Sequence, residues 1–300
     1  MNLYTQADSN VRKTWFLVFG FLIFIILIGW FFSYLLDSPV VLMIAVLFSI
    51  LMSFGSYWYS DKIVLAMMKA KPIEKKDNPK LYLLVENLCI TAGLPLPKIY
   101  IIEEKQPNAF ATGRNAQHAV VAVTRGLLER LEKIELEGVI GHELSHIGNK
   151  DMLLQTLVVV LVGSVVMLSD FFLRISFRSS RRSSDSRNKG GGLLIVLGIV
   201  AAILAPIAAK MIQLAISRKR EFLADASGAL LTRYPEGLAR ALEKIAADPS
   251  PLKVANNSAN HLFIYSPLRG NQTKGWFARL FMTHPPIEER IRALRGMETT

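Results

Sequence analysis

Two histidines and a glutamate stand close together near the middle of the chain, in the stretch His142-Glu143-Leu144-Ser145-His146. Residues four apart lie on one face of an α-helix, so both imidazoles can reach a single metal ion. Glu143 directly follows the first histidine, where a carboxylate beside an open coordination position can take a proton from water. This spacing is typical of zinc hydrolases, although chance can also produce so short a motif.

The residues before the motif indicate the helix that must carry it. Apolar residues recur there at roughly helical spacing, with charged residues between them: Leu131, Ile134, Leu136, Val139 and Ile140. Thr124 is a suitable N-cap, and no proline occurs between it and Asp151. The acidic side chains of this segment exclude a place in hydrocarbon, where each charge costs about 2.5 to 3.5 kcal/mol.

Long uncharged runs predict membrane-spanning helices, and hydrophobic residues make up 51% of the chain. Residues 14–36 and 40–60 carry no charge, and each run is long enough to cross a hydrocarbon core of about 30 Å. Two shorter uncharged runs, 152–169 and 190–209, follow the motif. We predict four transmembrane helices in two hairpins. For the second pair, the alternative is a buried hairpin within a soluble domain.

Basic residues on both sides of the first hairpin place its flanks, and with them the motif, in the cytoplasm. The Ser-, Arg- and Gly-rich loop 174–192 is expected to be flexible. Its positive charge favours the cytoplasm, whereas two further membrane crossings would place this loop on the opposite side. The second hairpin therefore either crosses the membrane despite this charge or only dips into it. The expected organisation is a cytoplasmic tail, a hairpin, a first catalytic part, a second hairpin and a second catalytic part: 1–13, 14–60, 61–151, 152–216 and 217–300.

The charge and the cysteine content limit the class of protein further. The net charge of +11 is spread over segments that flank the apolar runs, which indicates contact with anionic lipid of the bilayer. Nucleic acid is not an expected partner, because the chain contains no recognised nucleic-acid-binding module. Cys89 is the only cysteine, which excludes an intrachain disulfide and a cysteine-rich zinc site.

An acidic pair beyond the last apolar run supplies candidates for a third metal ligand. Glu221 and Asp225 are four apart and share a helical face. One can complete a zinc site, and the other can accept a hydrogen bond from a ligand imidazole and fix its tautomer. The alternative is a solvated face that balances Arg218 and Arg220. A third histidine close to the motif is excluded, because position 152 is Met.

The segments 141–146 and 217–225, together with the two apolar hairpins, make the chain similar to a known family. It resembles the HtpX family of bacterial inner-membrane zinc metalloproteases, which are relatives of the CAAX prenyl proteases. The resemblance implies a mainly α-helical, multi-pass membrane fold with a cytoplasmic, gluzincin-like α+β protease domain that carries a small β-sheet. It also implies a quality-control role in stress, with misfolded or damaged membrane proteins, or unfolded polypeptides, as substrates.

The same resemblance assigns roles to the residues of the two motifs. It implies one Zn²⁺ per chain, with His142, His146 and Glu221 as ligands. Glu143 is then the catalytic base, and Asp225 is the carboxylate that accepts a hydrogen bond from a ligand imidazole.

Two further segments are candidates for substrate contact. Strand-like runs at 98–102 and 119–123 predict a small sheet, and between them lies a segment that resembles the family's edge strand: Asn108, Ala109, Phe110 and Ala111. An edge strand can bind an extended peptide by strand addition, whereas the alternative is an ordinary turn. His284 and Arg290 resemble family residues that stabilise the oxyanion, although Pro285 and Pro286 can equally begin a surface helix.

We therefore expect a membrane-bound zinc endopeptidase of the bacterial inner membrane, with its active site in the cytoplasm. An intramembrane protease is a weaker alternative, because charged residues flank the motif on both sides. A prenyl-peptide processing protease shares the same chemistry. A non-catalytic membrane adaptor with a chance motif would contain no metal. The sequence does not define the oligomeric state.

Overall fold

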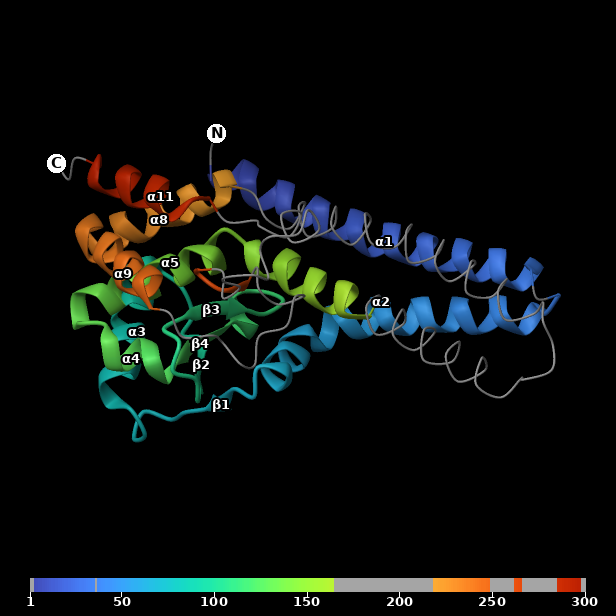
Figure 1. The fold of residues 1–300 in the computed structure, drawn as a ribbon, viewed down its shortest axis with the longest axis horizontal. Coiled ribbons are helices and arrows are strands. Elements are labelled where there is room, and N and C mark those ends of the chain that lie inside the picture. The colour runs from blue at the N-terminus through green and yellow to red at the C-terminus, as the bar shows by residue number, and fades with distance from the viewer. Residues whose placement is uncertain (1–2, 36, 165–217, 249–261, 266–284, 298–300) are drawn as a thin grey trace, which may run out of the picture.

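The computed structural model describes residues 3–35, 37–164, 218–248, 262–265 and 285–297 (Figure 1). A long pair of helices extends from one end of a compact mixed domain, which contains the sheet and the remaining helices. The predicted apolar run 190–209, the basic loop 174–192 and His284 lie outside the described residues.

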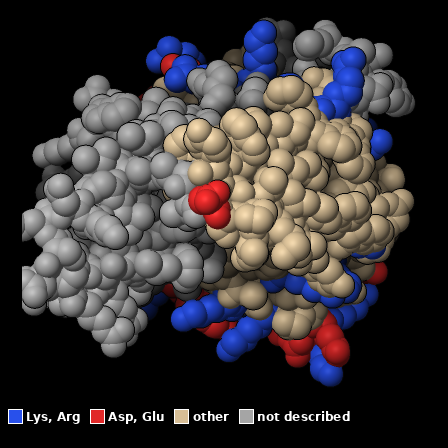
Figure 2. Space-filling model, turned by 90° about the vertical axis from the view of Figure 1, so that its right-hand side faces the viewer, with Lys and Arg blue, Asp and Glu red and all other residues tan. Residues whose placement is uncertain are grey.

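The long pair consists of α1 (Leu3–Leu35) and α2 (Pro39–Met67), which lie side by side (Figure 1). Both are long and apolar enough to cross a membrane, with spans at Ser9–Tyr34 and Pro39–Met67. Viewed from the end where they meet, the described part of the face is almost free of charged side chains, which gather at its margins (Figure 2). The described residues therefore confirm the first hairpin. Residues 3–13, predicted as a cytoplasmic tail, form the first turns of α1.

The motif lies on α5 (Lys133–Gly148), which ends in a sharp bend. After Lys150, whose φ is 56°, the chain turns by 86° into the helix Asp151–Ser164. This bent pair raises the number of candidate spans from two to at most three among the described residues. The second helix packs against α1 through buried apolar side chains: Leu17, Phe21, Ile25, Leu154, Val158, Leu161 and Val162. The motif thus lies where the domain meets the membrane helices.

A four-stranded mixed sheet forms the centre of the domain, in the order β1-β2-β4-β3. The strands are β1 (Lys71–Pro72), β2 (Lys98–Ile102), β3 (Ala109–Thr112) and β4 (Val120–Thr124). β2 pairs with β4 in parallel, and β3 pairs with β4 antiparallel at the edge of the sheet. A short 3-10 turn, η1 (Ala116–His118), lies in the connection between β3 and β4. The expected strands are therefore present, and the segment proposed as an edge is an edge strand.

Helices pack around this sheet and bury one continuous apolar core. They are α3 (Pro79–Ala92), α4 (Arg125–Arg130), α8 (Arg218–Thr232), α9 (Pro235–Ala247) and α11 (Ile287–Arg295). The Thr124 hydroxyl accepts a hydrogen bond from Leu127 N, as an N-cap does, but the helix it begins is the short α4. A separate capping box, formed by Glu132 and Glu135, begins α5. One long helix was expected here, and local capping divides it into two.

Close contact between α5 and α8 brings the two predicted motifs together. At Gly228 of α8, an added Cβ would lie 2.8 Å from the backbone nitrogen of His142. Only glycine allows so short an approach without a shift of the backbone. Glu221 and Asp225 lie two turns and one turn before Gly228, so this contact places both carboxylates beside the histidines.

Candidate metal centre

Three side chains converge in a buried cluster between α5 and α8. One ligand atom each of His142, His146 and Glu221 lies within 4.8 Å of the others, and this group could hold a metal ion. The Nε2 atoms of the two imidazoles are 3.2 Å apart. The carboxylate of Glu221 lies 3.7 Å from Nε2 of His146 and 3.9 Å from Nε2 of His142. All three residues are at most 5% exposed.

The other nitrogen of each imidazole faces its own carboxylate. Nδ1 of His142 lies 2.9 Å from Asp225, and Nδ1 of His146 lies 3.0 Å from Asp151. Each carboxylate therefore favours a proton on Nδ1, which leaves the Nε2 lone pairs directed at one another. Two lone pairs and a carboxylate at this spacing repel unless a cation or a proton lies between them. The donor set therefore fits a bound metal cation.

The pKa values of the two histidines shift in opposite directions. Burial lowers the pKa of His142. Burial also opposes the charged form of His146, but the carboxylates of Asp151 and Glu221 outweigh it and raise the pKa of His146 to about 9. Without metal, one proton is therefore held at the His146 side of the cluster.

A buried arginine fixes the carboxylate that faces His142. Nε and Nη2 of Arg290 donate to both oxygens of Asp225, at 2.8 and 2.6 Å, and Nη1 donates to the carbonyl of Ile264 at 2.8 Å. Burial alone would raise the pKa of Asp225, but the guanidinium lowers it to about 2. Asp225 therefore stays ionised, as a hydrogen-bond acceptor for an imidazole must be.

A different set of residues fixes the carboxylate that faces His146. Asp151 accepts a short hydrogen bond from Nδ2 of Asn10, a buried residue of α1. The same amide group donates to the carbonyl of Asn149 at 3.2 Å, and Oδ1 of Asn10 accepts from Arg220 at 3.1 Å. The sequence interpretation assigned no role to Asp151 or Asn10. The sequence did offer one indication of the role of Asp151, because a carboxylate only five residues after His146 can reach that imidazole. Asn10 carried no signal.

Glu143 is fully buried beside the same cluster. Its desolvation raises the pKa of the carboxyl group to about 7, and a backbone hydrogen bond from Ala111 on β3 opposes part of this rise. A carboxyl group with a pKa near neutrality can both take up and release a proton, which suits a general base. The edge strand thus contacts Glu143 directly.

The chain itself already pairs with the first part of the edge strand. The amide of Ile264 donates to the carbonyl of Ala109 at 3.1 Å, and the Asn108 side chain donates to the carbonyl of Tyr265 at 2.9 Å. Phe110 stacks edge-on against Phe263, with ring centroids 5.4 Å apart. Ala111 lies further along β3, next to Glu143. Any added strand would therefore align with the Ala111 end.

Of the two residues expected near the oxyanion, only Arg290 is described. Three of its N–H groups donate to Asp225 and Ile264, so the guanidinium is directed mainly at the protein. It also lies 3.8 Å from Glu221. In this arrangement Arg290 orders the carboxylates of the cluster.

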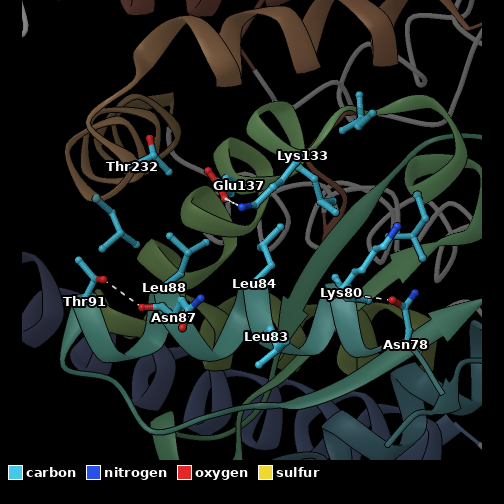
Figure 3. A pocket seen from close by; sticks show the side chains of 15 residues that line it. Asn78, Lys80, Leu83, Leu84, Asn87, Leu88, Thr91, Lys133, Glu137 and Thr232 are labelled. Carbon is cyan, nitrogen blue, oxygen red and sulfur yellow. Dashed lines mark hydrogen bonds and ion pairs between the residues drawn. The ribbon is translucent and has the colours of Figure 1, made fainter. Parts of the chain in front are cut away.

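A cavity of about 860 Å³ is separate from the metal centre. It lies between α3, α4, α5 and α8, and Leu84 and Leu88 point into it from α3, beneath Glu137 of α5 (Figure 3). Lys80, Asn87 and Thr91 form part of a polar rim. None of the clustered histidines or carboxylates lines it, so this cavity contributes nothing to the chemistry considered above.

Comparisons with known proteins agree with this geometry. Residues 75–298 match peptidase family M48. A protein named "Protease HtpX homolog" from Syntrophobacter fumaroxidans is 49% identical over 258 residues, which cover 85% of this chain and 89% of that protein. A protein of the same name from Dictyoglomus turgidum is 46% identical over 296 residues, 98% of this chain and 94% of that protein.

Among solved structures, the crystal structure of S. mikatae Ste24p aligns with 97% of this chain and 67% of that chain. The TM-score is 0.49, and the sequence identity is 19%. The family match covers most of the chain, and the relatives are similar over nearly their whole length. The chain therefore belongs to peptidase family M48, and it is a membrane metalloprotease.

Proposed function

We propose that the chain binds one Zn²⁺ through His142, His146 and Glu221 and hydrolyses peptide bonds in misfolded or damaged membrane proteins. The observation that carries the proposal is the pair of Nε2 atoms 3.2 Å apart, each on an imidazole whose Nδ1 faces a carboxylate. In a tetrahedral zinc site with Zn–N bonds of about 2.05 Å, neighbouring ligand atoms lie about 3.3 Å apart. The cluster thus supports zinc by both spacing and ligand type.

A zinc ion in this position would polarise the substrate carbonyl and lower the pKa of a water molecule. Glu143 then takes the proton from that water and passes it to the leaving amine. The Ala111 amide holds the Glu143 carboxylate in place for both transfers. Asp225 and Asp151 keep the proton of each imidazole on Nδ1, so that Nε2 stays available to the metal.

The edge strand β3 is the proposed substrate contact, with Asn108, Ala109, Phe110 and Ala111 as its residues. Strand addition recognises the main chain of a peptide, so it tolerates many sequences, as removal of damaged proteins requires. Because Ile264 already occupies the Ala109 carbonyl, we place the substrate next to Ala111. For Arg290 we propose a positioning role through Asp225, and for His284 the role of an oxyanion donor.

We further propose a bacterial inner-membrane location with the metal centre on the cytoplasmic side and four membrane-spanning segments. The support comes from the two described spans and from the basic residues that flank them, because Lys and Arg favour the cytoplasmic side. A role in the stress response follows from the expected substrates.

The test is the variant Glu143→Gln, purified with wild type in detergent and incubated with an unfolded model protein. The variant should keep its zinc and lose cleavage by a factor of at least about a hundred, since general base catalysis contributes that much or more. Glu137→Gln is the matched control, because Glu137 is half-buried on the same helix and lies outside the metal cluster. Near wild-type cleavage by Glu143→Gln would overturn the proposed mechanism.

A further inference from the structure

A second cavity, of about 410 Å³, lies where α2 meets the sheet. It is distinct from the metal centre and is lined by aromatic and basic side chains from three parts of the chain. Those that carry the inference come from α2, from the start of β2 and from the connection between β3 and β4: Trp58, Tyr59, Lys62, Lys98, Arg114 and His118.

The cavity lies at the depth of lipid headgroups. From Pro39 to Trp58, α2 rises about 29 Å, which is close to the hydrocarbon thickness of about 30 Å. A stripe of exposed apolar side chains follows one side of α2 and ends at the aromatic pair: Met43, Leu47, Leu51, Phe54, Trp58 and Tyr59. Trp and Tyr are enriched at the membrane–water boundary, and Lys62 lies one turn beyond them. The cavity therefore opens where the lipid-facing stripe ends.

The charge of the cavity is positive and not balanced by the described protein. Lys62, Lys98 and Arg114 line it, against the single carboxylate of Asp61. The ion pairs between carboxylates and cations of the described residues include none of these three cations. Cations brought together without acidic partners favour an anionic ligand.

Arg114 is held in a fixed orientation. Its guanidinium lies over the Trp58 ring, 4.7 Å from the centroid. Nη2 lies 2.7 Å from Nε2 of His118, and Nδ1 of that imidazole lies 2.7 Å from Oδ1 of Asn115. His118 therefore donates from Nδ1 and accepts from Arg114 at Nε2, as a neutral imidazole does. Two neighbours thus order the guanidinium and leave other N–H groups for a phosphate, which arginine binds through paired hydrogen bonds.

We propose that this cavity binds the phosphate-bearing headgroup of an anionic phospholipid from the adjoining leaflet. The phosphate then lies between Arg114, Lys62 and Lys98. The part of an acyl chain nearest the headgroup lies along the apolar stripe of α2. Arg114 follows the edge strand β3 by two residues, so a bound lipid also steadies the strand whose Ala111 amide contacts Glu143. The binding site itself does not depend on the proposed proteolytic role.

The test measures binding of dioctanoyl phosphatidylglycerol to the full chain in a neutral detergent, with dioctanoyl phosphatidylcholine and free glycerol 3-phosphate as separate probes. The anionic lipid should bind at least about tenfold more tightly than either of the others. Arg114→Gln should weaken its binding about tenfold to a hundredfold, the effect of one charge-assisted hydrogen-bonded contact. Lys98→Gln should weaken it as well and covers the case in which Arg114→Gln does not fold.

Lys80→Gln is the matched control, because Lys80 is exposed on α3 and does not line this cavity. Thermal unfolding at the temperature of wild type shows that each variant is folded. Equal binding of the two lipids would overturn the proposal. So would a loss of affinity in Lys80→Gln equal to that in Arg114→Gln, or unchanged affinity in both Arg114→Gln and Lys98→Gln. Glycerol 3-phosphate binding as tightly as the lipid would assign the site to a soluble phosphate instead.

Discussion

The two imidazoles of the metal centre are held in the same way but from different parts of the molecule. The carboxylate behind His142 is fixed by Arg290 of α11, within the mixed domain. The carboxylate behind His146 is fixed by Asn10, one residue inside the first membrane span. Half of the centre therefore depends on the domain alone, and the other half depends on how the domain sits on α1.

This difference shows how a membrane protein can couple a reactive site to its anchor. The 86° bend after α5 places Asp151 beneath His146 and against α1 at the same time. A displacement of α1 would thus be transmitted to His146 through Asp151. Substitutions that alter one half of the centre at a time test this difference.

The largest effect is expected for Arg290→Met, which breaks the domain-side half. It leaves the buried Asp225 carboxylate without its guanidinium partner, and loss of one member of a buried pair costs about 3 to 5 kcal/mol. Thermal unfolding in detergent measures this loss. Arg292→Met, at an exposed position of the same helix, should unfold like wild type. Unchanged unfolding of Arg290→Met would show that the arginine does not support the centre.

On the membrane side, Asp151→Asn should lower zinc affinity about tenfold to a hundredfold, the usual effect of losing a carboxylate that orients a ligand imidazole. Competition with a chelator measures the affinity. Asn10→Ala should produce a smaller loss, because Asp151 keeps its charge and loses only its orientation. Glu137→Gln serves as the control. If Asn10→Ala binds zinc with the affinity of wild type, the hydrogen bond between Asn10 and Asp151 does not contribute to zinc binding.

The pH dependence of zinc binding tests how Asp151 affects His146 on the membrane side of the centre. In the metal-free protein the pKa of His146 is raised to about 9, so below that pH a proton must leave before zinc binds. The apparent Kd should therefore rise about tenfold for each pH unit below about 9. Asp151→Asn lacks the carboxylate that raises the pKa of His146, so the increase in apparent Kd should begin at a lower pH. The same onset in both proteins would contradict the assignment of the shift to Asp151.

Much of the metal centre was predictable from local spacing. His142 and His146, like Glu221 and Asp225, are pairs four apart on helices, and such pairs share a face whatever the surrounding fold. The first hairpin was equally predictable, because uncharged apolar runs of that length are typical of membrane-spanning helices. The edge position of β3 was expected from the family resemblance.

The remaining features depend on long-range packing that spacing does not encode. Asp151 faces His146 only because the chain bends after Lys150, and Asn10 meets Asp151 across 141 positions of sequence. The division between α4 and α5 follows from the Glu132–Glu135 capping box, which competes with continuation of the helix. Arg290 was expected near the oxyanion, and its contacts to Asp225, which lie across 65 positions, carried no signal in the sequence.

The most direct test of the central claim is the zinc content of purified wild type, Glu143→Gln and Glu221→Ala, measured by elemental analysis per chain. We predict one zinc per chain in wild type and in Glu143→Gln, because Glu143 is not a ligand. Glu221→Ala should lose most of its zinc, since two imidazoles alone leave the cluster incomplete. A Glu221→Ala protein with the zinc content and affinity of wild type would contradict the account.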